Sequence, residues 1–394
     1  MSVPLFDTST PLDPLRAELR AAVERVLDSG RYILGPEVQA FEREFAAHCG
    51  ASHAVGVANG TEAITIALRA MGVGPGDEVV VPSFTFYASA EAIPPTGAIP
   101  VFCDIDPDTY CVTADTVRAA LTPRTKAVIA VHLFGNLAPV AEIEALGVPV
   151  LEDAAQAAGS RLGEGTASSP TGPSAVGGEA QAAPGSPATS EEPNEAGRRP
   201  GALGTAATFS FFPSKNLGCF GDGGAITTSD PEIAERARTL RFHGSHDKIT
   251  YEHVGYNSRL DELQAAILRV QLPHLDTWAD GRREAGSHYE RAGLGELVSL
   301  PRPTVGAQPA WHLYVIGHPH PPPLEAALTA AGIGHKSYYR TPIHRQAPMC
   351  AWDADVELPA TDHAATTHLA IPMSPVLTRE QAVEVVAAVR GAVA

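Results

Sequence analysis

Apolar positions recur at helical spacing near the start of the chain. Between residues 12 and 29, apolar side chains such as Leu15, Leu19 and Val26 fall on one face of a helix with 3.6 residues per turn. Gly30 follows, and glycine is the residue type that most often ends a helix. We therefore predict an amphipathic helix that ends at Gly30.

A second helical pattern, residues 37–48, precedes a long region in which short apolar runs alternate with helix-like stretches. The runs are rich in β-branched residues and read AVGVANG, EVVVPSFTF, IPVFCDID, KAVIAVHLFG and PVLEDAAQAAG. Buried strands separated by helical segments are typical of a mostly parallel sheet that helices cover. The pattern predicts an α/β layered domain.

Residues 163–201 break this alternation. The segment has no aromatic residue, Leu or Ile and is crowded with Gly, Pro, Ser, Ala and Glu, so it cannot bury enough apolar surface to offset the entropy of ordering it. We predict a disordered surface insertion, with a lid or docking tail as the alternative. The expected parts are a helical arm (1–30), a large domain with this insertion (31–275) and a smaller C-terminal α/β domain (276–394).

Composition narrows the class of ligand. The chain of 394 residues carries a formal net charge of −17, and this charge repels nucleic acids and anionic membranes. We therefore expect a small ligand, no nucleic acid and no membrane. The N-terminus lacks the basic start and apolar core of a secretory signal. No apolar run reaches the length of about 18 residues that a membrane-spanning helix needs, so we expect a cytoplasmic protein.

Neither a disulfide framework nor a metal site is expected. The five cysteines are an odd number and include no C-x-x-C pair. The pairs His243/His246 and His318/His320 lack a third ligand at a recognisable spacing.

Candidate chemistry begins at Lys215, between the aromatic run FSFFPS and a glycine-rich turn. Alone, such a lysine is usually a solvated surface charge.

Gly60 and Thr61 fall between a predicted strand and helix, where free N–H groups and the helix dipole bind phosphate. The alternative interpretation is an Asn-Gly turn with a Thr cap. Phe86 follows another strand and either stacks on a planar ring or packs in the core.

Two further stretches carry polar residues at the ends of predicted elements. Glu152 and Asp153 end a strand, where ligands bind in open α/β sheets, and Gln156 follows one helical turn later. A carboxylate there favours a cationic partner such as a protonated pyridine nitrogen, which makes the ring an electron sink. VGYNSRLDELQAAIL is a polar turn before an amphipathic helix, for which Asn257 or Ser258 is equally well interpreted as a cap.

Taken in order, these stretches resemble the sugar aminotransferases of the DegT/DnrJ/EryC1/StrS family, pyridoxal-phosphate enzymes of the aspartate-aminotransferase fold (fold type I). The resemblance runs through SGRYILGPEVQAFEREFAAHCG, NGTEAITIAL, GDEVVVPSFTFYAS, EDAAQAAGS, FFPSKNLGCFGDGGAI, GYNSRLDELQAAIL, YYRTPIHRQAPM and IPMSPVLT. Each motif alone is weak, but the ordered set is specific. It implies a large domain with a mostly parallel, seven-stranded-type sheet, a smaller C-terminal α/β domain and the cofactor pyridoxal 5′-phosphate.

The resemblance also implies roles for residues of this chain. Lys215 matches the lysine that forms the Schiff base with the cofactor and then carries the proton between substrate and cofactor. Asp153 matches the carboxylate on the pyridine nitrogen, Gln156 the residue beside the ring hydroxyl and Phe86 the residue stacked on the ring. The implied phosphate contacts are Gly60, Thr61, Glu62, Ser210 and, reaching the cofactor of the neighbouring subunit, Asn257. The active sites would then be shared across a homodimer.

The implied substrate contacts depart from the family pattern. Where relatives that act on 3-keto sugars have His-Tyr-Pro, this chain has Tyr338, Tyr339 and Arg340, which leaves the position of the keto group open. Because arginine suits a diphosphate and aromatic faces suit a nucleobase, we predict that these three residues and His344 contact a sugar nucleotide, with a polar loop as the alternative. Arg31 and Tyr32 are predicted to line the neighbour's substrate cleft.

One branch of the family replaces the lysine with histidine and dehydrates its substrate, whereas this chain keeps Lys215. We therefore expect an aminotransferase that moves an amino group, with L-glutamate as the expected donor, to a nucleotide-linked keto-sugar in deoxyamino-sugar biosynthesis. A pyridoxal-phosphate-dependent sugar dehydratase and a catalytically silent, regulatory relative remain the alternatives.

Overall fold

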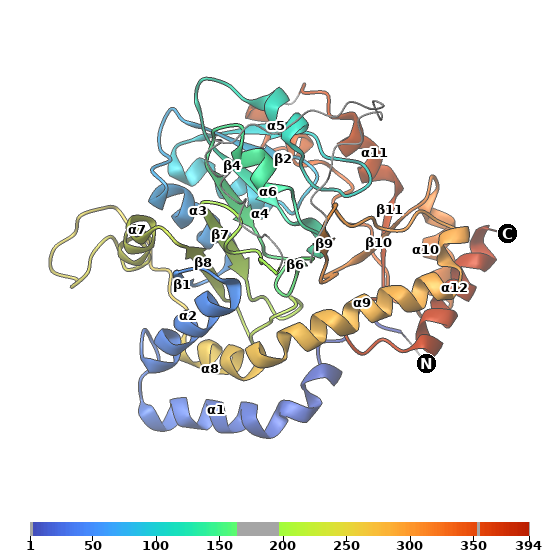
Figure 1. The fold of residues 1–394 in the computed structure, drawn as a ribbon, viewed down its shortest axis with the longest axis horizontal. Helices are drawn as coiled ribbons and strands as arrows, with labels where there is room; N and C mark the ends of the chain where they lie inside the picture. Colours follow the sequence, from blue (N-terminus) through green and yellow to red (C-terminus); the bar gives the residue numbers. More distant parts are fainter. Residues whose placement is uncertain (1–2, 164–196, 353–354, 394) are drawn as a thin grey trace, which may run out of the picture.

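A seven-stranded sheet forms the centre of the larger part of the molecule (Figure 1). The structure is a computed structural model that describes residues 3–163, 197–352 and 355–393. Its strand order is β1-β8-β7-β5-β4-β2-β3, with β8 antiparallel to both neighbours and the other pairs parallel. The predicted mostly parallel α/β sheet is confirmed. The strands are β1 (His53–Val57), β2 (Glu78–Pro82), β3 (Ile99–Cys103), β4 (Thr125–Val131), β5 (Val150–Asp153), β7 (Ala206–Ser210) and β8 (Gly224–Thr228).

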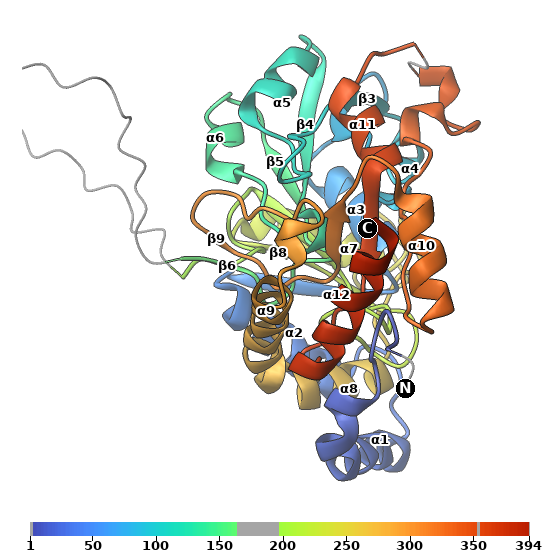
Figure 2. The same cartoon turned by 90° about the vertical axis from the view of Figure 1, so that its right-hand side faces the viewer.

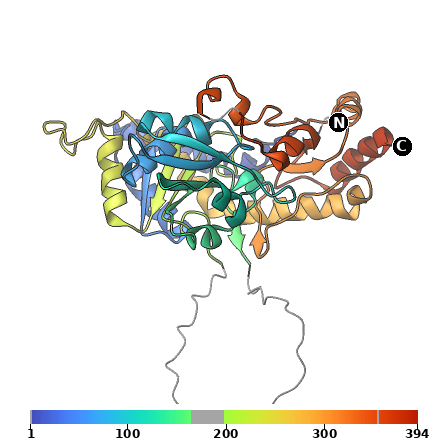
Figure 3. The ribbon, with the colours of Figure 1, turned by 90° about the horizontal axis from the view of Figure 1, so that it is seen from above.

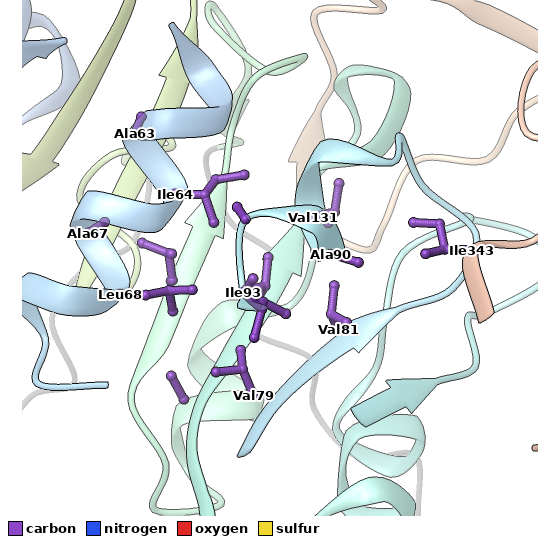
Figure 4. Close-up of a cluster of buried hydrophobic side chains, with 14 of the residues drawn as sticks. Ala63, Ile64, Ala67, Leu68, Val79, Val81, Ala90, Ile93, Val131 and Ile343 are labelled. Atoms are coloured by element: carbon purple, nitrogen blue, oxygen red, sulfur yellow. The ribbon is translucent and has the colours of Figure 1, made fainter. Parts of the chain in front are cut away.

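Helices pack on both faces of this sheet, because alternate residues of a strand point to opposite sides. In β2, Val79 and Val81 join a cluster with Leu68, whereas Val80 belongs to a cluster on the other face. Figure 4 shows Val79, Leu68 and Ile93 close together at the centre of the first cluster. Burial on both sides explains why the strands read as nearly continuous apolar runs.

The helices agree with the predicted pattern. The predicted helix over residues 12–29 begins as a 3-10 helix, η1 (Thr10–Leu15), continues as α1 and ends at Gly30, whose φ of 63° suits glycine. The α-helices are α1 (Arg16–Ser29), α2 (Pro36–Cys49), α3 (Gly60–Ala70), α4 (Ala88–Glu91), α5 (Ala114–Ala120), α6 (Val140–Glu144), α7 (Pro231–Arg241), α8 (Glu262–Gln271), α9 (Leu275–Arg291), α10 (Pro321–Ala330), α11 (Pro359–Thr367) and α12 (Arg379–Val393). The remaining 3-10 helices are η2 (Pro94–Thr96), η3 (Leu133–Gly135), η4 (Leu272–His274), η5 (Leu294–Glu296), η6 (Ile343–Arg345) and η7 (Cys350–Trp352).

The N-terminal arm contacts two parts of the molecule. Its first residues are extended: the carbonyl of Val3 accepts a hydrogen bond from Gly334 N, and the carbonyl of Leu5 accepts one from Met373 N. Farther along, α1 packs against α8 through Leu19 and Ile267, and Figure 2 shows the two helices side by side. The arm therefore ties the large sheet to the C-terminal part of the chain.

The C-terminal part has its own two-stranded antiparallel sheet, β10 (Tyr314–Gly317) with β11 (His368–Ile371). A buried cluster including Tyr289, Leu324 and Val385 packs α9, α10 and α12 around it. Seen from above, the red and orange C-terminal helices lie at the end of the molecule opposite α7 (Figure 3). The domain boundary that we predicted at residue 275 falls on the first residue of α9 and stays a prediction.

Two short strands, β6 (Arg161–Leu162) and β9 (Ala307–Gln308), pair antiparallel beside the predicted insertion. Most of that insertion, residues 164–196, lies outside the described residues, and its predicted disorder stays a prediction. No helix in the described ranges is long and apolar enough to cross a membrane.

Candidate active site

Lys215 lies on the loop that follows β7, next to the carboxyl end of β5. Because β5 and β7 are parallel neighbours, Asp153 at the end of β5 and the loop after Ser210 meet at the same edge of the sheet. The side chain of Lys215 is half-buried, and this burial lowers its pKa to about 8, against an opposing effect of Asp153. The surface-charge interpretation of Lys215 is therefore wrong: a substantial fraction of its amine is neutral near physiological pH.

The carboxylate of Asp153 is buried and oriented by local hydrogen bonds. Ser89 Oγ donates to Oδ2 at 2.7 Å and Ala155 N donates to Oδ1 at 3.2 Å, while Thr85 Oγ1 lies 3.1 Å from Ser89 Oγ. Only 6% of Asp153 is exposed. A buried, negatively charged carboxylate stabilises the protonated form of a basic group that binds next to it.

Glu152 has a different role from Asp153, although the sequence analysis grouped them. It is fully buried on the opposite side of β5, where Leu203 N and Gly204 N donate to Oε1 at 3.0 and 2.9 Å. His132 accepts a hydrogen bond at Nδ1 from Ala138 N and therefore donates from Nε2 to Glu152 Oε2 at 2.8 Å. Glu152 thus holds the chain that enters β7 rather than facing a ligand.

Gln156 connects the end of β5 to two aromatic residues. Its Oε1 accepts from Phe134 N at 2.7 Å and its Nε2 donates to the Tyr339 hydroxyl at 3.1 Å. The Tyr339 ring stacks on Phe134 with an interplanar angle of 6° and lies 6.5 Å from the ring of Phe86. Phe86 is 57% exposed, so one predicted ring contact is open to a ligand and core packing does not explain it.

The N-terminus of α3 supplies a candidate phosphate site. Asn59 is the N-cap, and its Oδ1 accepts from Glu62 N at 2.8 Å, so the Thr61 cap offered as an alternative is wrong. Within the described residues, Gly60 N and Thr61 N have no hydrogen-bond acceptor. These two amides, at the positive end of an eleven-residue helix, remain for an anion.

Gly60 also packs tightly against Ser210 of β7. A Cβ added at Gly60 would lie 2.8 Å from Ser210 Cβ, which only the absence of a side chain allows. The close approach brings the free amides of α3 and the Ser210 hydroxyl to one place. The structure therefore brings Gly60, Thr61 and Ser210 together as the resemblance implied, while the Glu62 amide is already used by the helix cap.

Asn257 and Ser258 precede α8 in the chain but do not cap it. The N-cap of α8 is Asp261, and buried Ser258 instead accepts from Ala58 N at 3.1 Å, so the cap interpretation of both residues is wrong. The side chain of Asn257 is exposed. Its predicted contact with a neighbouring subunit stays a prediction.

The predicted substrate residues divide into two groups. Tyr338 is half-buried beside Tyr339, and Arg340 is exposed and paired with Glu325. His344, in contrast, is fully buried, with Nδ1 2.6 Å from Ser83 Oγ. It has no surface that a substrate could reach, so the prediction of a substrate contact at His344 is wrong.

Arg31 and Tyr32 precede α2 and are exposed. The carbonyl of Tyr32 accepts from Glu262 N, and the Glu262 carboxylate in turn accepts from Gly35 N and Val38 N at 2.8 Å each. The segment is therefore anchored to the start of α8 with its side chains outward. Its predicted role in a neighbour's substrate cleft stays a prediction.

The histidine pairs do not form metal sites with a third ligand. Within the described ranges, no group of three or more His, Cys, Asp or Glu residues could hold a metal ion. His318 Nδ1 is hydrogen-bonded to the backbone of His320, and His246 contacts Glu235 and Glu252.

Comparison with solved structures identifies the fold. The chain superposes on the crystal structure of S. venezuelae DesV in complex with a ketimine intermediate with a TM-score of 0.87 and 41% identity, covering 99% of this chain and 98% of that chain. The architecture is therefore that of a pyridoxal-phosphate-dependent aminotransferase of fold type I. The chain belongs to the DegT/DnrJ/EryC1/StrS aminotransferase family, whose sequence pattern matches residues 14–390.

Two curated relatives align along nearly the whole chain. The dTDP-3-amino-3,4,6-trideoxy-alpha-D-glucose transaminase of Streptomyces venezuelae is 43% identical over 98% of this chain and 95% of its own length. A protein of Geobacillus stearothermophilus named pleiotropic regulatory protein is 41% identical over 97% of this chain and 96% of its own length.

The residues around Lys215 fit the cofactor that this family implies. The two free amides of α3 suit its phosphate, Asp153 suits a protonated pyridine nitrogen and Lys215 suits its aldehyde. The exposed ring of Phe86 suits its aromatic face.

Substituting Gly60→Val is expected to weaken binding of pyridoxal phosphate about 10- to 100-fold, because a side chain there displaces Ser210 and screens the two free amides. Titration of the apoprotein with the cofactor measures the effect. Gly74→Val is the matched control, because a Cβ at Gly74 meets no atom within 4 Å. Equal affinity of both variants would contradict the placement of the phosphate at α3.

Proposed function

We propose that the protein is a pyridoxal-phosphate-dependent aminotransferase that moves an amino group from L-glutamate to a nucleotide-linked keto-sugar. One observation carries the proposal: a half-buried lysine of lowered pKa lies at the same sheet edge as a buried, oriented carboxylate. The free amides at the N-terminus of α3 complete a site for a phosphorylated pyridine. Family membership supports the same reaction.

Each residue has a separate task in this proposal. Bound pyridoxal phosphate would supply an electron sink for the carbanion formed at the substrate carbon. Lys215 binds the cofactor through Nζ and, once released, moves a proton at the substrate carbon, which requires a neutral amine. Asp153 keeps the pyridine nitrogen protonated, and Ser89 fixes the direction of its carboxylate. Gln156, held by Phe134 and Tyr339, would help to orient the ring.

The keto group of the sugar is proposed to be at C3. The Streptomyces venezuelae relative is named for a 3-amino sugar, and its high identity extends over the whole chain. Tyr338, Tyr339 and Arg340 are proposed to contact the sugar nucleotide, since Tyr339 lies between Phe86 and Gln156 at the edge of the site. Arg340 would have to exchange its partner Glu325 for a phosphate.

A catalytically silent, regulatory protein is the second candidate, because one relative of 41% identity is named a pleiotropic regulatory protein. Absorption spectra of the purified protein separate the two candidates. An aminotransferase loses the visible band of the bound cofactor when L-glutamate is added and regains it with a 3-keto sugar nucleotide. If the visible band of the cofactor persists after glutamate is added, the aminotransferase proposal is wrong for this donor. A dehydratase would instead consume the sugar nucleotide without an amino donor.

The rate at which the apoprotein takes up pyridoxal phosphate is expected to rise about tenfold per pH unit below pH 8 and to level off above it. The reason is that burial lowers the pKa of Lys215 to about 8 and only the neutral amine attacks the aldehyde. Stopped-flow absorbance between pH 6 and 9.5 checks this. A rate that still rises tenfold per unit above pH 9 would mean that Lys215 has the pKa of an exposed lysine.

We further propose a homodimer with shared active sites. Phe212 and Phe220, on the loop that carries Lys215, are each more than half exposed. In the loop after α7, Ile249 and Val254 are 83% and 84% exposed. Figure 1 shows this loop projecting from the body of the molecule. Exposed apolar groups of this size commonly mark an interface.

Substituting Ile249→Asp or Val254→Asp is expected to raise the dimer dissociation constant at least tenfold, because burying either side chain contributes about 1.5–3 kcal/mol. Sedimentation equilibrium measures the change. Val305→Asp, at an equally apolar position that is 77% exposed elsewhere, should leave the constant unchanged. A wild-type protein that sediments as a monomer would contradict the proposed dimer.

A cytoplasmic location completes the proposal. All five cysteines are free thiols, four of them buried, as expected in a reducing compartment.

A further inference from the structure

A cavity of about 420 Å³ lies behind Lys215, between the N-terminal arm and the loop that carries the lysine. Its walls come from the arm between Phe6 and Arg20, from the loop between Pro213 and Phe220, and from Gln271, Trp278, Arg282 and Pro375. Asp153, Gln156 and Phe86 do not line it. Lys215 is therefore the point at which this cavity meets the proposed cofactor site.

The cavity is cationic although the protein carries a net charge of −17. Four of its lining residues are basic, namely Lys215, Arg16, Arg20 and Arg282, and Asp7 supplies the one carboxylate among the lining residues. Arg16 is paired with Asp13 at 2.7 Å, so the positive charge of the walls comes mainly from Lys215, Arg20 and Arg282. Asp7 Oδ1 accepts from Thr10 N at 2.9 Å and from Ser9 N, so this carboxylate is held by the arm's own backbone and is outnumbered by the basic residues. The walls favour an anionic ligand.

Arg282 is the buried cation of this group. Only 7% of it is exposed, its Nη1 donates to the Trp311 carbonyl at 3.2 Å, and its Nε has no hydrogen-bond partner. Within the described ranges no carboxylate forms an ion pair with it, whereas the adjacent Arg283 pairs with Asp280. Burial lowers the pKa of Arg282 to about 10, so the side chain stays charged at neutral pH.

A buried arginine without a carboxylate is costly. Its charge would be compensated by a ligand carboxylate, which guanidinium groups bind through two parallel hydrogen bonds. His312 lies near the same charge and neither neutralises it nor adds to it, because burial and the positive charges of Lys215 and Arg282 hold its pKa well below the usual value and keep the ring neutral.

Asn216, the next residue after Lys215, lines the same cavity and offers the opposite polarity. Both hydrogens of its amide are used: Nδ2 donates to the carbonyls of Ala158 and Ala310 at 3.2 and 3.1 Å. These bonds fix the amide so that Oδ1 is its acceptor end, and Oδ1 has no partner. An unpaired acceptor and an unpaired cation on one wall match the ammonium and carboxylate groups of an amino acid.

We infer that this cavity binds the amino donor, with Arg282 holding a carboxylate of the donor and Asn216 facing its amino group beside Lys215. The inference rests on the proposed aminotransferase function. A diphosphate of the sugar nucleotide is the other anion with suitable chemistry. The donor is favoured because the unpaired acceptor of Asn216 suits an ammonium group and has no counterpart in a diphosphate.

Arg282→Gln tests the inference in the holoenzyme. The concentration of L-glutamate needed for half-maximal conversion of the cofactor band should rise at least about 30-fold, since loss of one partner of a buried charge pair costs 2–5 kcal/mol. The second half-reaction, with the keto-sugar nucleotide, should change less than threefold. Arg283→Gln on the same helix is the matched control and should leave both half-reactions unchanged.

Binding of glutarate, a dicarboxylate without an amino group, gives a second readout that needs no turnover. Calorimetry should detect glutarate binding to the wild type and to Arg283→Gln but at least about 30-fold weaker binding to Arg282→Gln. If the variant instead loses affinity for a nucleoside diphosphate and keeps glutarate, the cavity binds the nucleotide and the inference is overturned.

Failure of the proposed function is distinguishable from failure of this inference. If the wild-type protein binds glutarate through Arg282 but does not react with L-glutamate, the carboxylate site is supported and the aminotransferase proposal is wrong. A wild type that reacts with L-glutamate, together with an Arg282→Gln variant of unchanged glutamate dependence, would overturn the inference alone. Arg282→Lys keeps the positive charge in the cavity wall and replaces Arg282→Gln if that variant does not fold. It should weaken glutarate binding measurably but less than tenfold. An unchanged affinity for glutarate would count against the site.

Discussion

Lys215→Ala is expected to lower the rate of amino transfer about 10⁴-fold or more. The substitution removes the amine that binds the cofactor and also the group that moves the proton, and a positioned acid–base group alone contributes up to about 10⁴-fold. The fold should be unaffected, because Lys215 is half-buried and forms none of the ion pairs described for the structure.

Two measurements test this expectation together. Steady-state assay with L-glutamate and a keto-sugar nucleotide gives the rate, and the absorption spectrum shows whether the cofactor is attached covalently. Lys126→Ala, an exposed lysine on β4, is the control and should behave as the wild type. If Lys215→Ala retained more than about one tenth of the activity, another residue would have to move the proton and the proposed mechanism would be wrong.

The fold was largely predictable because its signals are local and repeated. Strands buried on both faces read as apolar runs, as in β2 and β4, and the helices between them have their own periodicity. The antiparallel direction of β8 could not be read in this way, since Gly224–Thr228 has the same composition as a parallel strand. Direction depends on the connection between strands, which periodicity does not encode.

Site residues were predictable where their residue type is characteristic of a strand end or a helix start. Asp153 and Gly60 are such residues, and both lie where the sequence placed them. Contacts between distant segments were not predictable. Ser89 orients Asp153 from 64 residues away, and Glu262 caps α2 from more than 220 residues away, and no spacing rule links these pairs.

His344 shows the limit of reasoning by residue type. Histidine beside Tyr and Arg is a reasonable ligand for a nucleotide, but here its ring is fully buried and hydrogen-bonded to Ser83. The same limit applies to Arg282, a helical arginine whose sequence context does not differ from that of Arg283. Only the structure shows that one is unpaired in a cavity wall and the other is paired on the surface.

Asp153→Asn is expected to lower the rates of both half-reactions about 10²- to 10³-fold while leaving the protein folded. Asparagine keeps the size of the side chain but removes the charge that holds the pyridine nitrogen protonated, and loss of one preorganised electrostatic group in an active site typically costs this much. The cofactor should still bind, because the phosphate contacts of α3 are not altered. Rapid-mixing absorbance with L-glutamate measures the first half-reaction.

Glu152→Gln is the informative counterpart, since the two carboxylates are adjacent in β5 but lie on opposite faces. Glu152 accepts hydrogen bonds from His132 and from the amides that lead into β7, so its loss should lower the free energy of unfolding by about 1.5–3 kcal/mol with at most a tenfold effect on rate. Chemical denaturation gives the stability of both variants. If Asp153→Asn lost stability but not rate and Glu152→Gln lost rate but not stability, the assignment of the catalytic carboxylate would be reversed. In the proposed mechanism, the alternation of side chains along one strand therefore decides which of the two neighbouring acids would face the cofactor.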